Sequence, residues 1–290
     1  MIATLHAAHP EWSERLLCGL LSVARSSFYY APKPADDLEL RDIIEQIALE
    51  FPRYGYRRVT VELERRGHEA NHKRVLRIMR EESLLVEVQR LCRTTNSEHQ
   101  YGRFPNLVKG LVIDRVDWVW CADITYVRLQ REFVYLAVIL DIFTRSVRGW
   151  ELGHNLTEEL TRTALEQALA KGREPAIHHS DQGVQYAATD YVERLQGLGI
   201  EVSMAARGQP TENAFAERFM RTLKEEEVYL NEYRDFAEAR QRIGRFLDDV
   251  YQHKRVHSAL GYKTPAEFEA EHLREPGYDC LPACTRSSGC

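Results

Sequence analysis

Apolar residues follow two different patterns along the chain. Before about residue 93 they recur every three or four positions, as in amphipathic helices. After about residue 112 they form short, nearly continuous runs rich in Val, Ile, Trp and Tyr, as in buried strands. The mostly polar residues 93–112 separate the two parts and include Pro105 and Gly110. This change predicts a helical region over 1–92, a linker over 93–112 and an α/β core from 113 onward.

Two helices are expected in the first half of the helical region. Residues 11–24 predict one, which Ser26 and Ser27 would end unless they cap the next helix. Apolar residues at helical spacing over 40–47 predict another, and Pro52 ends it.

Residues 53–82 predict two short basic helices around a tight turn. Gly67 ends the first helix, and Asn71 is a favourable N-cap for the second. Apolar residues occupy one face of each helix, namely Val59, Leu63, Val75, Ile78 and Met79. Basic residues occupy other positions, namely Arg57, Arg58, Lys73, Arg74, Arg77 and Arg80. This pattern is typical of a helix-turn-helix, whose second helix enters the major groove of DNA. A plain helical hairpin with solvated arginines is the alternative.

The second part of the chain predicts an α/β fold with a mixed five-stranded sheet and flanking helices. The expected strands are 118–129, 133–143, 146–152, 176–179 and 200–204. The expected helices are 157–171 with Thr157 as its cap, 190–198, a long helix opened by Thr211, 236–254 and 265–272. Three adjacent antiparallel strands followed by parallel additions give the ribonuclease-H-like order.

Composition excludes several classes of protein. The 290 residues are 44% hydrophobic and 29% charged, with 16 Gly and 10 Pro, which excludes collagen-like, disordered and low-complexity chains. No apolar run reaches the roughly 18 residues that a membrane span needs. The N-terminus lacks the pattern of a signal peptide. Six scattered cysteines indicate a reducing, cytoplasmic setting rather than a disulfide framework.

The net charge of −5 conceals an uneven distribution. Residues 1–52 carry 4 basic and 8 acidic side chains, residues 53–110 carry 13 and 7, and residues 111–290 carry 22 and 29. A short basic segment beside a long acidic one favours a nucleic-acid-binding module joined to another domain. A solvated charged surface would give the same counts.

Two acids in the predicted sheet are candidates for catalysis. Asp123 lies in the middle of a strand so apolar that both of its faces are expected to be buried. An isolated carboxylate there is costly unless it is paired or bound to a metal ion. Asp181 follows the fourth strand, at the end where ligands of open α/β sheets gather. Taken singly, either acid could instead hold a turn or a backbone group.

The third candidate, Glu217, lies on the predicted long helix. Arg221 and Lys224 share its face. The opposite face is apolar and is expected to pack on the sheet; it consists of Phe215, Phe219 and Leu223. Glu212 is the rival acid, although it lies on a different face and in the first turn, where acids favour the helix dipole. A solvated helix face would explain the same charges.

Together the three acids are more specific than any one of them. Asp123 is in the first strand, Asp181 follows the fourth, and 35 residues separate Asp181 from Glu217. Three carboxylates suit Mg²⁺ or Mn²⁺. Two such ions can activate a water or a 3′-hydroxyl and stabilise the leaving oxygen of a phosphodiester. A fourth acid, Asp141, is expected to shape a hairpin end instead.

Longer stretches carry a family resemblance. In the helical module they are Tyr-Gly-Tyr-Arg-Arg-Val (54–59) and His-Lys-Arg-Val-Leu-Arg-Ile-Met-Arg (72–80). In the core they are Trp-Cys-Ala-Asp-Ile-Thr-Tyr (120–126), His-Ser-Asp-Gln-Gly-Val-Gln-Tyr (179–186), the segment 208–219 and the closing segment 251–268. With these, residues from about 16 to 272 resemble OrfB, the second reading-frame product of the bacterial insertion-sequence family numbered three. OrfB proteins are transposases related to retroviral integrases.

The resemblance implies an Asp-Asp-35-Glu core. In it Asp123, Asp181 and Glu217 hold two Mg²⁺ or Mn²⁺ ions, while Lys224 and Arg221 contact DNA. It implies cleavage of one strand at an element end and transfer of that strand to target DNA. It also implies fusion with an upstream-frame product, OrfA, by ribosomal frameshifting. A homo-oligomer on DNA, a nucleoid-associated location in the bacterial cytoplasm and no membrane association complete the expectation.

The chain departs from the family pattern at few positions. Gln252 and Val256 replace the usual Asn and Pro of the closing signature, and Gln182 stands where a basic residue is common. These changes concern the preference for target or element end, because none affects the three acids.

The tail, residues 275–290, lies outside the resemblance and is expected to be disordered. The tail contains Cys280, Cys284 and Cys290, and His272 is nearby. Zinc binding by these residues is an alternative, but their spacing fits no standard zinc site.

We therefore expect a DNA transposase subunit with a helical DNA-binding region over 1–92, a catalytic core over 113–232 and a helical extension over 233–274. A non-catalytic DNA-binding regulator is one alternative, and the intact set of acids argues against it. A ribonuclease-H-like, structure-selective nuclease is the other. The basic helical module and the C-terminal helices favour transposition over it.

Overall fold

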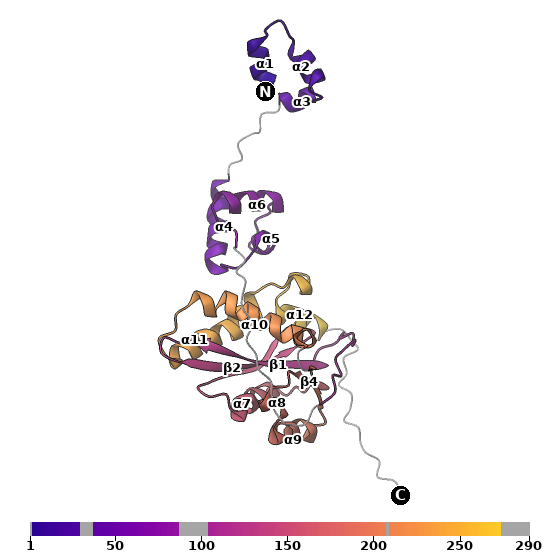
Figure 1. Ribbon diagram of the computed structural model, residues 1–290, viewed down its shortest axis with the longest axis vertical. Helices are drawn as coiled ribbons and strands as arrows, with labels where there is room; N and C mark the ends of the chain where they lie inside the picture. The colour runs from indigo at the N-terminus through magenta and orange to yellow at the C-terminus, as the bar shows by residue number, and fades with distance from the viewer. Residues whose placement is uncertain (1, 30–36, 87–103, 207–208, 274–290) are drawn as a thin grey trace. The chain divides into compact units, whose positions relative to one another are not determined.

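The computed structural model describes residues 2–29, 37–86, 104–206 and 209–273. The predictions for the tail and for most of the linker therefore lie outside the described residues. The chain divides into two compact units, residues 1–43 and 44–290, and helix α4 (Leu38–Glu50) crosses the boundary between them (Figure 1).

The first unit is a small cluster of short helices. They are α1 (Ile2–Ala8), α2 (Glu14–Leu20) and α3 (Arg25–Phe28). The hydroxyl of Ser13 accepts a hydrogen bond from the Leu16 amide at 3.2 Å and so fixes the start of α2. The predicted single helix over 11–24 is wrong in its bounds for this reason. Ser26 and Ser27 lie inside α3 and do not end a helix.

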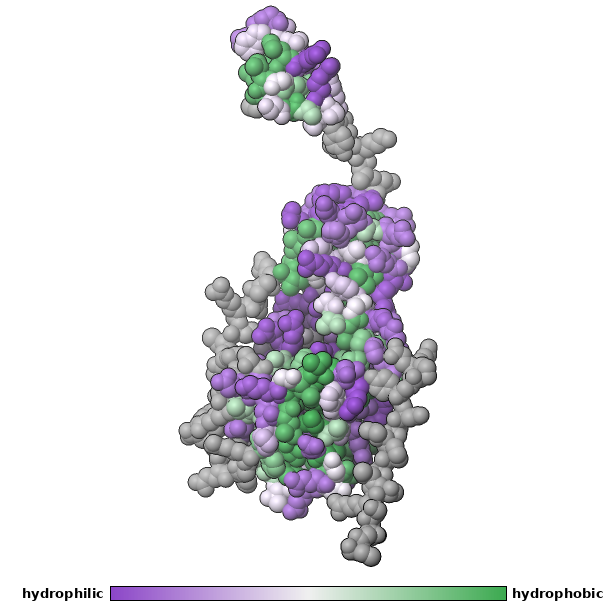
Figure 2. Space-filling view, turned by 90° about the vertical axis from the view of Figure 1, so that its right-hand side faces the viewer, coloured by the Kyte–Doolittle hydropathy of each residue, from purple (hydrophilic) through white to green (hydrophobic). Residues whose placement is uncertain are grey.

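The predicted helical hairpin is present as α5 (Tyr56–Arg65) and α6 (His72–Glu81). Asn71 caps α6 as expected, since its side-chain oxygen accepts a hydrogen bond from the Lys73 amide at 2.9 Å. Gly67 has a φ of +83°, which only glycine adopts without strain, and it ends α5. The apolar stripes of both helices are buried. Figure 2 shows that the surface around α5 and α6 is largely hydrophilic, whereas apolar residues gather in a band on the core.

The predicted five-stranded sheet is confirmed. Its strands are β1 (Val119–Arg128), β2 (Phe133–Asp141), β3 (Val147–Gly153), β4 (Ile177–Ser180) and β5 (Glu201–Met204). They lie in the order β3-β2-β1-β4-β5. The first three are antiparallel to one another, and β4 and β5 add in parallel on the other side of β1. This is the ribonuclease-H-like order.

Helices cover both faces of the sheet (Figure 1). One face packs against α7 (Glu158–Leu169), α8 (Val184–Ala187) and α9 (Thr189–Gly197). The other packs against α10 (Ala214–Glu226), α11 (Phe236–Arg245) and the π-helix η3 (Phe246–Lys254). A Cβ atom on Gly149 of β3 would lie 2.2 Å from the Ala164 carbonyl oxygen of α7, so only glycine allows this close approach.

Three expected helix details differ in the structure. Thr157 is the N-cap residue of α7, but its side chain makes no capping hydrogen bond. A 3₁₀ turn, η1 (Pro210–Asn213), precedes α10, so the α-helix begins at Ala214 rather than at Thr211. The helix expected over 236–254 continues from α11 into η3 with π-helical hydrogen bonding.

The C-terminal elements are two short 3₁₀ turns, η2 (Val228–Leu230) and η4 (Ser258–Leu260), and helix α12 (Pro265–His272). Thr264 and Glu267 form a capping box at the start of α12, with each side chain bonded to the backbone amide of the other. None of the helices in the described parts of the chain has the length and apolar character needed to span a membrane.

Candidate metal centre and active site

Asp123 lies in the central strand of the sheet, one position beyond the part of β1 that pairs with β4. It pairs with Val138 of β2, and its Oδ1 accepts a hydrogen bond from the Ile124 amide at 2.8 Å. Residues 119–122 are buried, whereas Asp123 is partly exposed. The expectation of burial on both faces is therefore correct only as far as Ala122, because β4 ends beside that residue.

The strand register brings Asp181 next to Asp123. Ser180, the last residue of β4, pairs with Ala122 of β1 in parallel, so the two acids occupy the next position along adjacent strands. Asp181 Oδ1 also accepts a hydrogen bond from the Gly183 amide at 2.9 Å. The carboxylate thus holds the turn after β4, as the simpler explanation required, and it lies beside Asp123 as well.

Helix α10 carries Glu217 in its first turn. The buried face of this helix consists of Ala216, Phe219, Met220 and Leu223. Phe215 was expected on this face but is 40% exposed. Helical periodicity places Phe215 at the border of the buried face, where the Arg145 guanidinium lies 4.1 Å from the centre of its ring. Glu217 is partly exposed on the other side of the buried face.

Electrostatic interactions join the three acids. Burial, followed by the carboxylates of Asp181 and Glu217, raises the pKa of Asp123 to about 8. The Ile124 amide and the Lys224 ammonium act in the opposite direction. A negative charge on Asp123 is therefore opposed by the carboxylates of Asp181 and Glu217, and Lys224 offsets this opposition only in part.

The donor chemistry of these acids fits a hard divalent cation. Within the described residues, no three His, Cys, Asp or Glu side chains lie close enough to enclose a metal ion. Asp123, Asp181 and Glu217 are thus one electrostatic group rather than a closed cage. Carboxylate oxygens in an open arrangement suit Mg²⁺ or Mn²⁺, since such an ion usually keeps several waters and takes other ligands from phosphate.

Glu212, the rival third acid, has a structural role. Its carboxylate accepts hydrogen bonds from the Ala206 amide at 2.8 Å, from the Asn106 side chain at 2.9 Å and from Lys109 at 3.1 Å. These bonds, that of the Ala206 amide first, lower the pKa of Glu212 to about 2. The carboxylate anchors the loop that precedes α10, so we discard it as an alternative to Glu217.

Two polar residues that the sequence did not single out hold the same loop. One ring nitrogen of His179 bonds to the Ser203 hydroxyl at 2.9 Å and the other to the Glu212 carbonyl at 3.1 Å. The Asn213 amide donates to the Ala122 carbonyl at 3.2 Å. Burial lowers the pKa of His179, which favours the neutral ring. Two adjacent histidines in a short apolar strand were the only sequence signal of this arrangement.

Of the two predicted phosphate contacts on α10, Lys224 lies near the acids. Its Nζ is 4.5 Å from the centre of the Tyr126 ring, three residues beyond Asp123 in β1. Its charge lowers the pKa of Asp123, which requires proximity. Arg221, one turn nearer the helix start, is exposed.

The basic residues of the helical hairpin have different environments. Four are exposed, namely Arg57, Lys73, Arg77 and Arg80. Arg74 was expected to be exposed but is partly buried. Arg58 is also partly buried, lies over the Tyr54 ring and faces Glu226 of α10 at 3.5 Å. Its charge is thus shared with a carboxylate 168 residues away in the sequence.

The segment of α5 also bonds to the C-terminal part of the second unit. The Val256 amide donates to the Tyr54 hydroxyl at 2.9 Å. Arg65 forms a two-fold hydrogen bond with the Glu267 carboxylate, at 2.5 and 3.1 Å. These contacts connect the helical hairpin to the segment 251–268.

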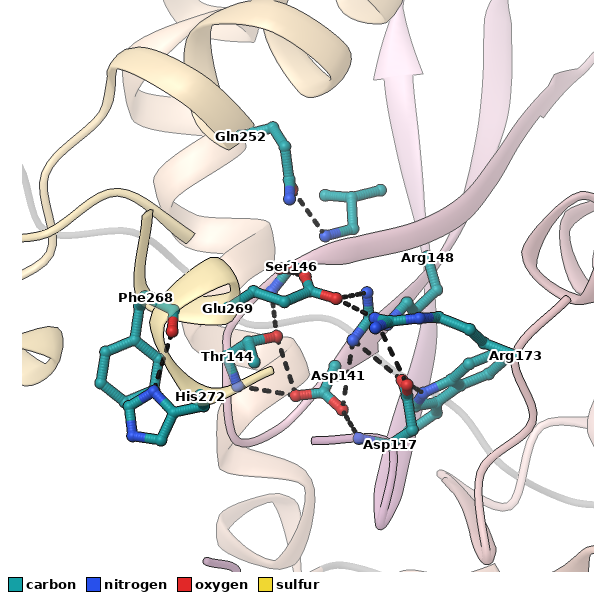
Figure 3. A network of polar contacts seen from close by, with 12 residues as sticks. Asp117, Asp141, Thr144, Ser146, Arg148, Arg173, Gln252, Phe268, Glu269 and His272 are labelled. Carbon is teal, nitrogen blue, oxygen red and sulfur yellow. Dashed lines mark hydrogen bonds and ion pairs between the residues drawn. The ribbon is translucent and has the colours of Figure 1, made fainter. Parts of the chain in front are cut away.

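A second acidic cluster surrounds Asp141, at the end of β2 (Figure 3). Asp141 accepts hydrogen bonds from the Thr144 amide at 2.6 Å and from the Asp117 amide at 2.7 Å. The prediction that Asp141 shapes the hairpin end is confirmed. Arg148 pairs with Asp117 at 2.8 Å and with Glu269 of α12 at 2.7 Å. Arg173 pairs with Asp117 and Glu269 as well.

The zinc alternative finds no support in the described residues. The three tail cysteines lie outside them. His272 packs on the Phe143 and Phe268 rings, and its Nδ1 bonds to the Phe268 carbonyl at 2.8 Å. Its role is accounted for by the packing of α12.

Comparison with protein-family models gives three matches. Residues 114–210 match an integrase core domain, and residues 198–265 match a second model with the same description. Residues 35–93 match an HTH-like domain.

Curated relatives cover most of the chain. A 31 kDa protein of insertion element IS600 from Shigella sonnei is 34% identical over 269 residues, which are 88% of this chain and 98% of that protein. The transposase of IS904 from Lactococcus lactis is 34% identical over 75% of this chain and 87% of its own length. The IS3A transposase InsF of Escherichia coli is 29% identical over 91% and 96%.

Among solved structures, the HTLV-2 integrase catalytic core domain in complex with magnesium aligns with a TM-score of 0.43 and 18% identity. The alignment covers 53% of this chain and 96% of that one.

Proposed function

Because this chain belongs to the IS3-family transposases, we propose that Asp123, Asp181 and Glu217 are the residues with which it cuts and joins DNA. The protein is a DNA transposase, a polynucleotidyl transferase of the DDE type, with an integrase core and an HTH-like domain. Enzymes of this type use divalent metal ions.

The observation that carries the proposal is the register of β1 and β4, which places Asp181 beside Asp123. The raised pKa of Asp123 agrees with it, because burial contributes most to the rise and the Asp181 and Glu217 carboxylates contribute next. Carboxylates that raise one another's pKa are unfavourable for folding, and a bound cation would offset this repulsion. We assign two Mg²⁺ or Mn²⁺ ions to the three carboxylates. When bound, such ions supply an activated oxygen nucleophile and stabilise the leaving oxygen of the phosphodiester.

The protein's own residues prepare this site. Asp123 must lose its proton before it can act as a ligand, so binding of the cation should release protons near neutral pH. Asn213 and His179 hold the loop before α10 against β1 and β4. They thereby set the position of Glu217, four residues after Asn213. Lys224 supplies a positive charge for a DNA phosphate close to the acids.

The helical hairpin supplies further DNA contacts. We assign them to the exposed residues of α5 and α6, namely Arg57, Lys73, Arg77 and Arg80, with Arg74 at the edge of the same surface. Arg58 and Arg77 would contribute less, because Glu226 and Glu81 already offset their charges. Arg221 would assist Lys224 on α10.

The assembly extends beyond this chain. Relatives of this kind bind DNA and oligomerise. We further propose a homo-oligomer on the element ends, fusion with an upstream-frame OrfA product, and action on the bacterial nucleoid. Neither a non-catalytic regulator nor a structure-selective nuclease is favoured by any of the comparisons.

A strand-joining assay tests the proposal. The substrate is a duplex carrying the element's terminal repeat, precleaved to expose the 3′-hydroxyl, with Mg²⁺ and a target duplex. Glu217→Gln should lower the joining rate by roughly 10²–10³-fold or more, since it would weaken the binding of the cation that stabilises charge at the reacting phosphate. The matched control is Glu193→Gln, at an exposed carboxylate on α9 across the sheet, which should join at the wild-type rate. Equal rates for both variants would contradict the assignment. Wild-type cleavage of an uncut duplex without joining of the precleaved one would favour the nuclease.

A further inference from the structure

A cavity of about 410 Å³ lies beside α10. Phe215, Arg218 and Thr222 of α10 line it, together with Arg145 from the turn between β2 and β3. Helical periodicity places these α10 residues on a different side of the helix from Glu217 and Lys224. The acids of the proposed active site are not among its lining residues.

The cavity wall is strongly basic. Six arginines and three acids line it; they are Arg53, Arg58, Arg145, Arg218, Arg221 and Arg255, with Asp141, Glu225 and Glu226. Two of these acids already form ion pairs or hydrogen bonds with neighbouring residues. Glu226 pairs with Arg255 at 2.6 Å and with Arg58 at 3.5 Å. Asp141 is held by backbone amides and lies beside Arg148.

The remaining arginines form an unbalanced positive group. Within the described residues, Arg145, Arg218 and Arg221 have no carboxylate at ion-pair distance. One acid of the wall, Glu225, is present against these three guanidinium groups. An anion in the cavity would therefore meet a net positive charge.

Arg145 is held in place for such contact. Its backbone has a φ of +65°, and its amide donates to the Asp141 carbonyl at 2.9 Å, so the turn is tightly defined. The guanidinium stacks on Phe215 at 4.1 Å, which limits its freedom and explains why this ring is exposed. Burial and the positive charge of Arg218 lower the pKa of Arg145. A bound anion would relieve both effects.

The cavity is close to the proposed reaction centre. The Cys121 thiol, at the cavity wall, is influenced electrostatically by Arg145 and also by Asp123. Duplex DNA carries one phosphate charge per roughly 1.7 Å of its axis, so a duplex that reaches the acids presents further phosphates nearby.

We propose that this cavity binds a backbone phosphate of the duplex on which the enzyme acts, through Arg145 and Arg218. The inference rests on the proposed function and adds a DNA-anchoring site on the other side of α10. Guanidinium groups suit this ligand because their planar donors match phosphate oxygens two at a time.

The test compares two double variants with the same change in net charge. Arg145→Gln with Arg218→Gln removes the cavity charges, and Arg162→Gln with Arg194→Gln removes two exposed charges on α7 and α9. The probe is a short duplex of random sequence, titrated against the full-length chain over a range of salt concentrations. For the cavity variant, the slope of log affinity against log salt should fall by about one, because the variant loses one phosphate contact and about one counterion is released per such contact. The control variant should keep the wild-type slope.

A lysine version makes the test independent of folding defects. Arg145→Lys with Arg218→Lys retains the charges and should keep the wild-type slope, while thermal denaturation shows whether each variant is folded. An unchanged slope in the folded glutamine variant would overturn the proposal. So would a loss of slope in the lysine variant equal to that in the glutamine variant.

Inorganic phosphate distinguishes the two possible sources of the ligand. Phosphate alone should stabilise the wild type more than the glutamine variant in thermal denaturation, because the same guanidinium groups would hold it. If phosphate stabilises only the wild type while duplex affinity is unchanged, the cavity is a site for a free anion and the DNA assignment is wrong. Wild-type strand joining, measured in parallel, shows separately whether the proposed function is correct.

Discussion

Two groups of acids lie in the same core, but the charges that surround them differ in sign. Around Asp141, each carboxylate faces a guanidinium group, a hydroxyl or a backbone amide. The pKa of Asp123 is raised by the carboxylates of Asp181 and Glu217 and lowered by the Lys224 ammonium. Burial raises the pKa of both aspartates. The next influence on Asp141 is Arg148, which lowers its pKa, whereas the next influence on Asp123 is Asp181, which raises it.

This difference separates a structural role from a chemical one. Acids that are matched within the chain stabilise the fold and leave little affinity for an external cation. Acids that repel one another lower the stability of the fold. Their ionised forms are favoured only where another partner, such as a metal ion, offsets the repulsion. Mutation should therefore have opposite consequences in the two groups.

The largest effect is expected for Asp123→Asn. Strand joining should fall by roughly 10²–10³-fold or more, while the metal-free protein should become more stable. The folded-state pKa of Asp123, about 8, lies above the ordinary value of 3.8 for an aspartate. The contribution of Asp123 to the stability of the fold is fully present below pH 3.8 and is lost as the pH rises through about 8. The stability advantage of the variant should thus grow from about pH 4 to pH 8 and then level off, as measured by thermal denaturation in EDTA.

Asp190→Asn, at an exposed acid on α9, serves as the control and should change neither stability nor joining. A metal-free Asp123→Asn protein that is less stable than the wild type at pH 8 would remove the contrast between the two acidic groups.

The next effect concerns the matched group. Arg148→Met should lower the free energy of unfolding by roughly 3–5 kcal/mol, because it leaves buried carboxylates without their cation. Urea denaturation measures this loss. Arg234→Met removes an exposed ion pair with Glu238 instead and should cost no more than about 1 kcal/mol. Equal losses of unfolding free energy in the two variants would show that Arg148 does not stabilise the buried carboxylates around it.

A smaller effect is expected for Lys224→Ala. The variant should bind the DNA end more weakly, with a salt slope lower by about one, because one phosphate contact is lost. Its affinity for Mn²⁺, measured by calorimetry, should stay close to that of the wild type. Lys254→Ala, on η3 beside Asp249, is the matched control. A loss of Mn²⁺ binding would place Lys224 in the metal site rather than in a DNA contact.

The smallest effect is expected for Glu212→Gln, an acid five residues before Glu217 that behaves like the matched group. Its folded-state pKa of about 2 lies below the ordinary value of 4.5 for a glutamate. Its stabilisation is therefore present above pH 4.5 and is lost as the pH falls toward 2. The wild type should melt at a slightly higher temperature than the variant at pH 7, and the gap should close in acid. A gap that is constant from pH 7 to pH 3 would contradict this role.

The sheet and most helices could be predicted from the sequence because they follow local patterns. Apolar runs marked the five strands, and Gly67 and Asn71 marked the ends of α5 and α6. Asp123 could be predicted as a candidate because a carboxylate in an apolar strand is unusual. The structure places it beside Asp181 through the register of β1 and β4. Each of these patterns can be recognised from residues that are close together in the sequence.

Features that depend on distant segments could not be predicted. The role of Glu212 requires Asn106, and that of Arg58 requires Glu226, 168 residues away. Phe215 was assigned to the buried face from helical periodicity alone, but the turn that carries Arg145 meets it at the surface. The 3₁₀ turn before α10 likewise depends on the loop that His179 holds.

The capping box at α12 and the ion pair between Arg148 and Glu269 have a consequence for biosynthesis. Arg148 lies in β3, and its partner follows 121 residues later, near the end of the described chain. Ribosomes add residues from the N-terminus at roughly 5–20 per second, so the sheet leaves the exit tunnel several seconds before Glu269 is made. During that interval Arg148 lacks one of its carboxylates. Final closure of the core should therefore come late in translation, and a transcript truncated before α12 should yield a protein that is degraded rather than an active fragment.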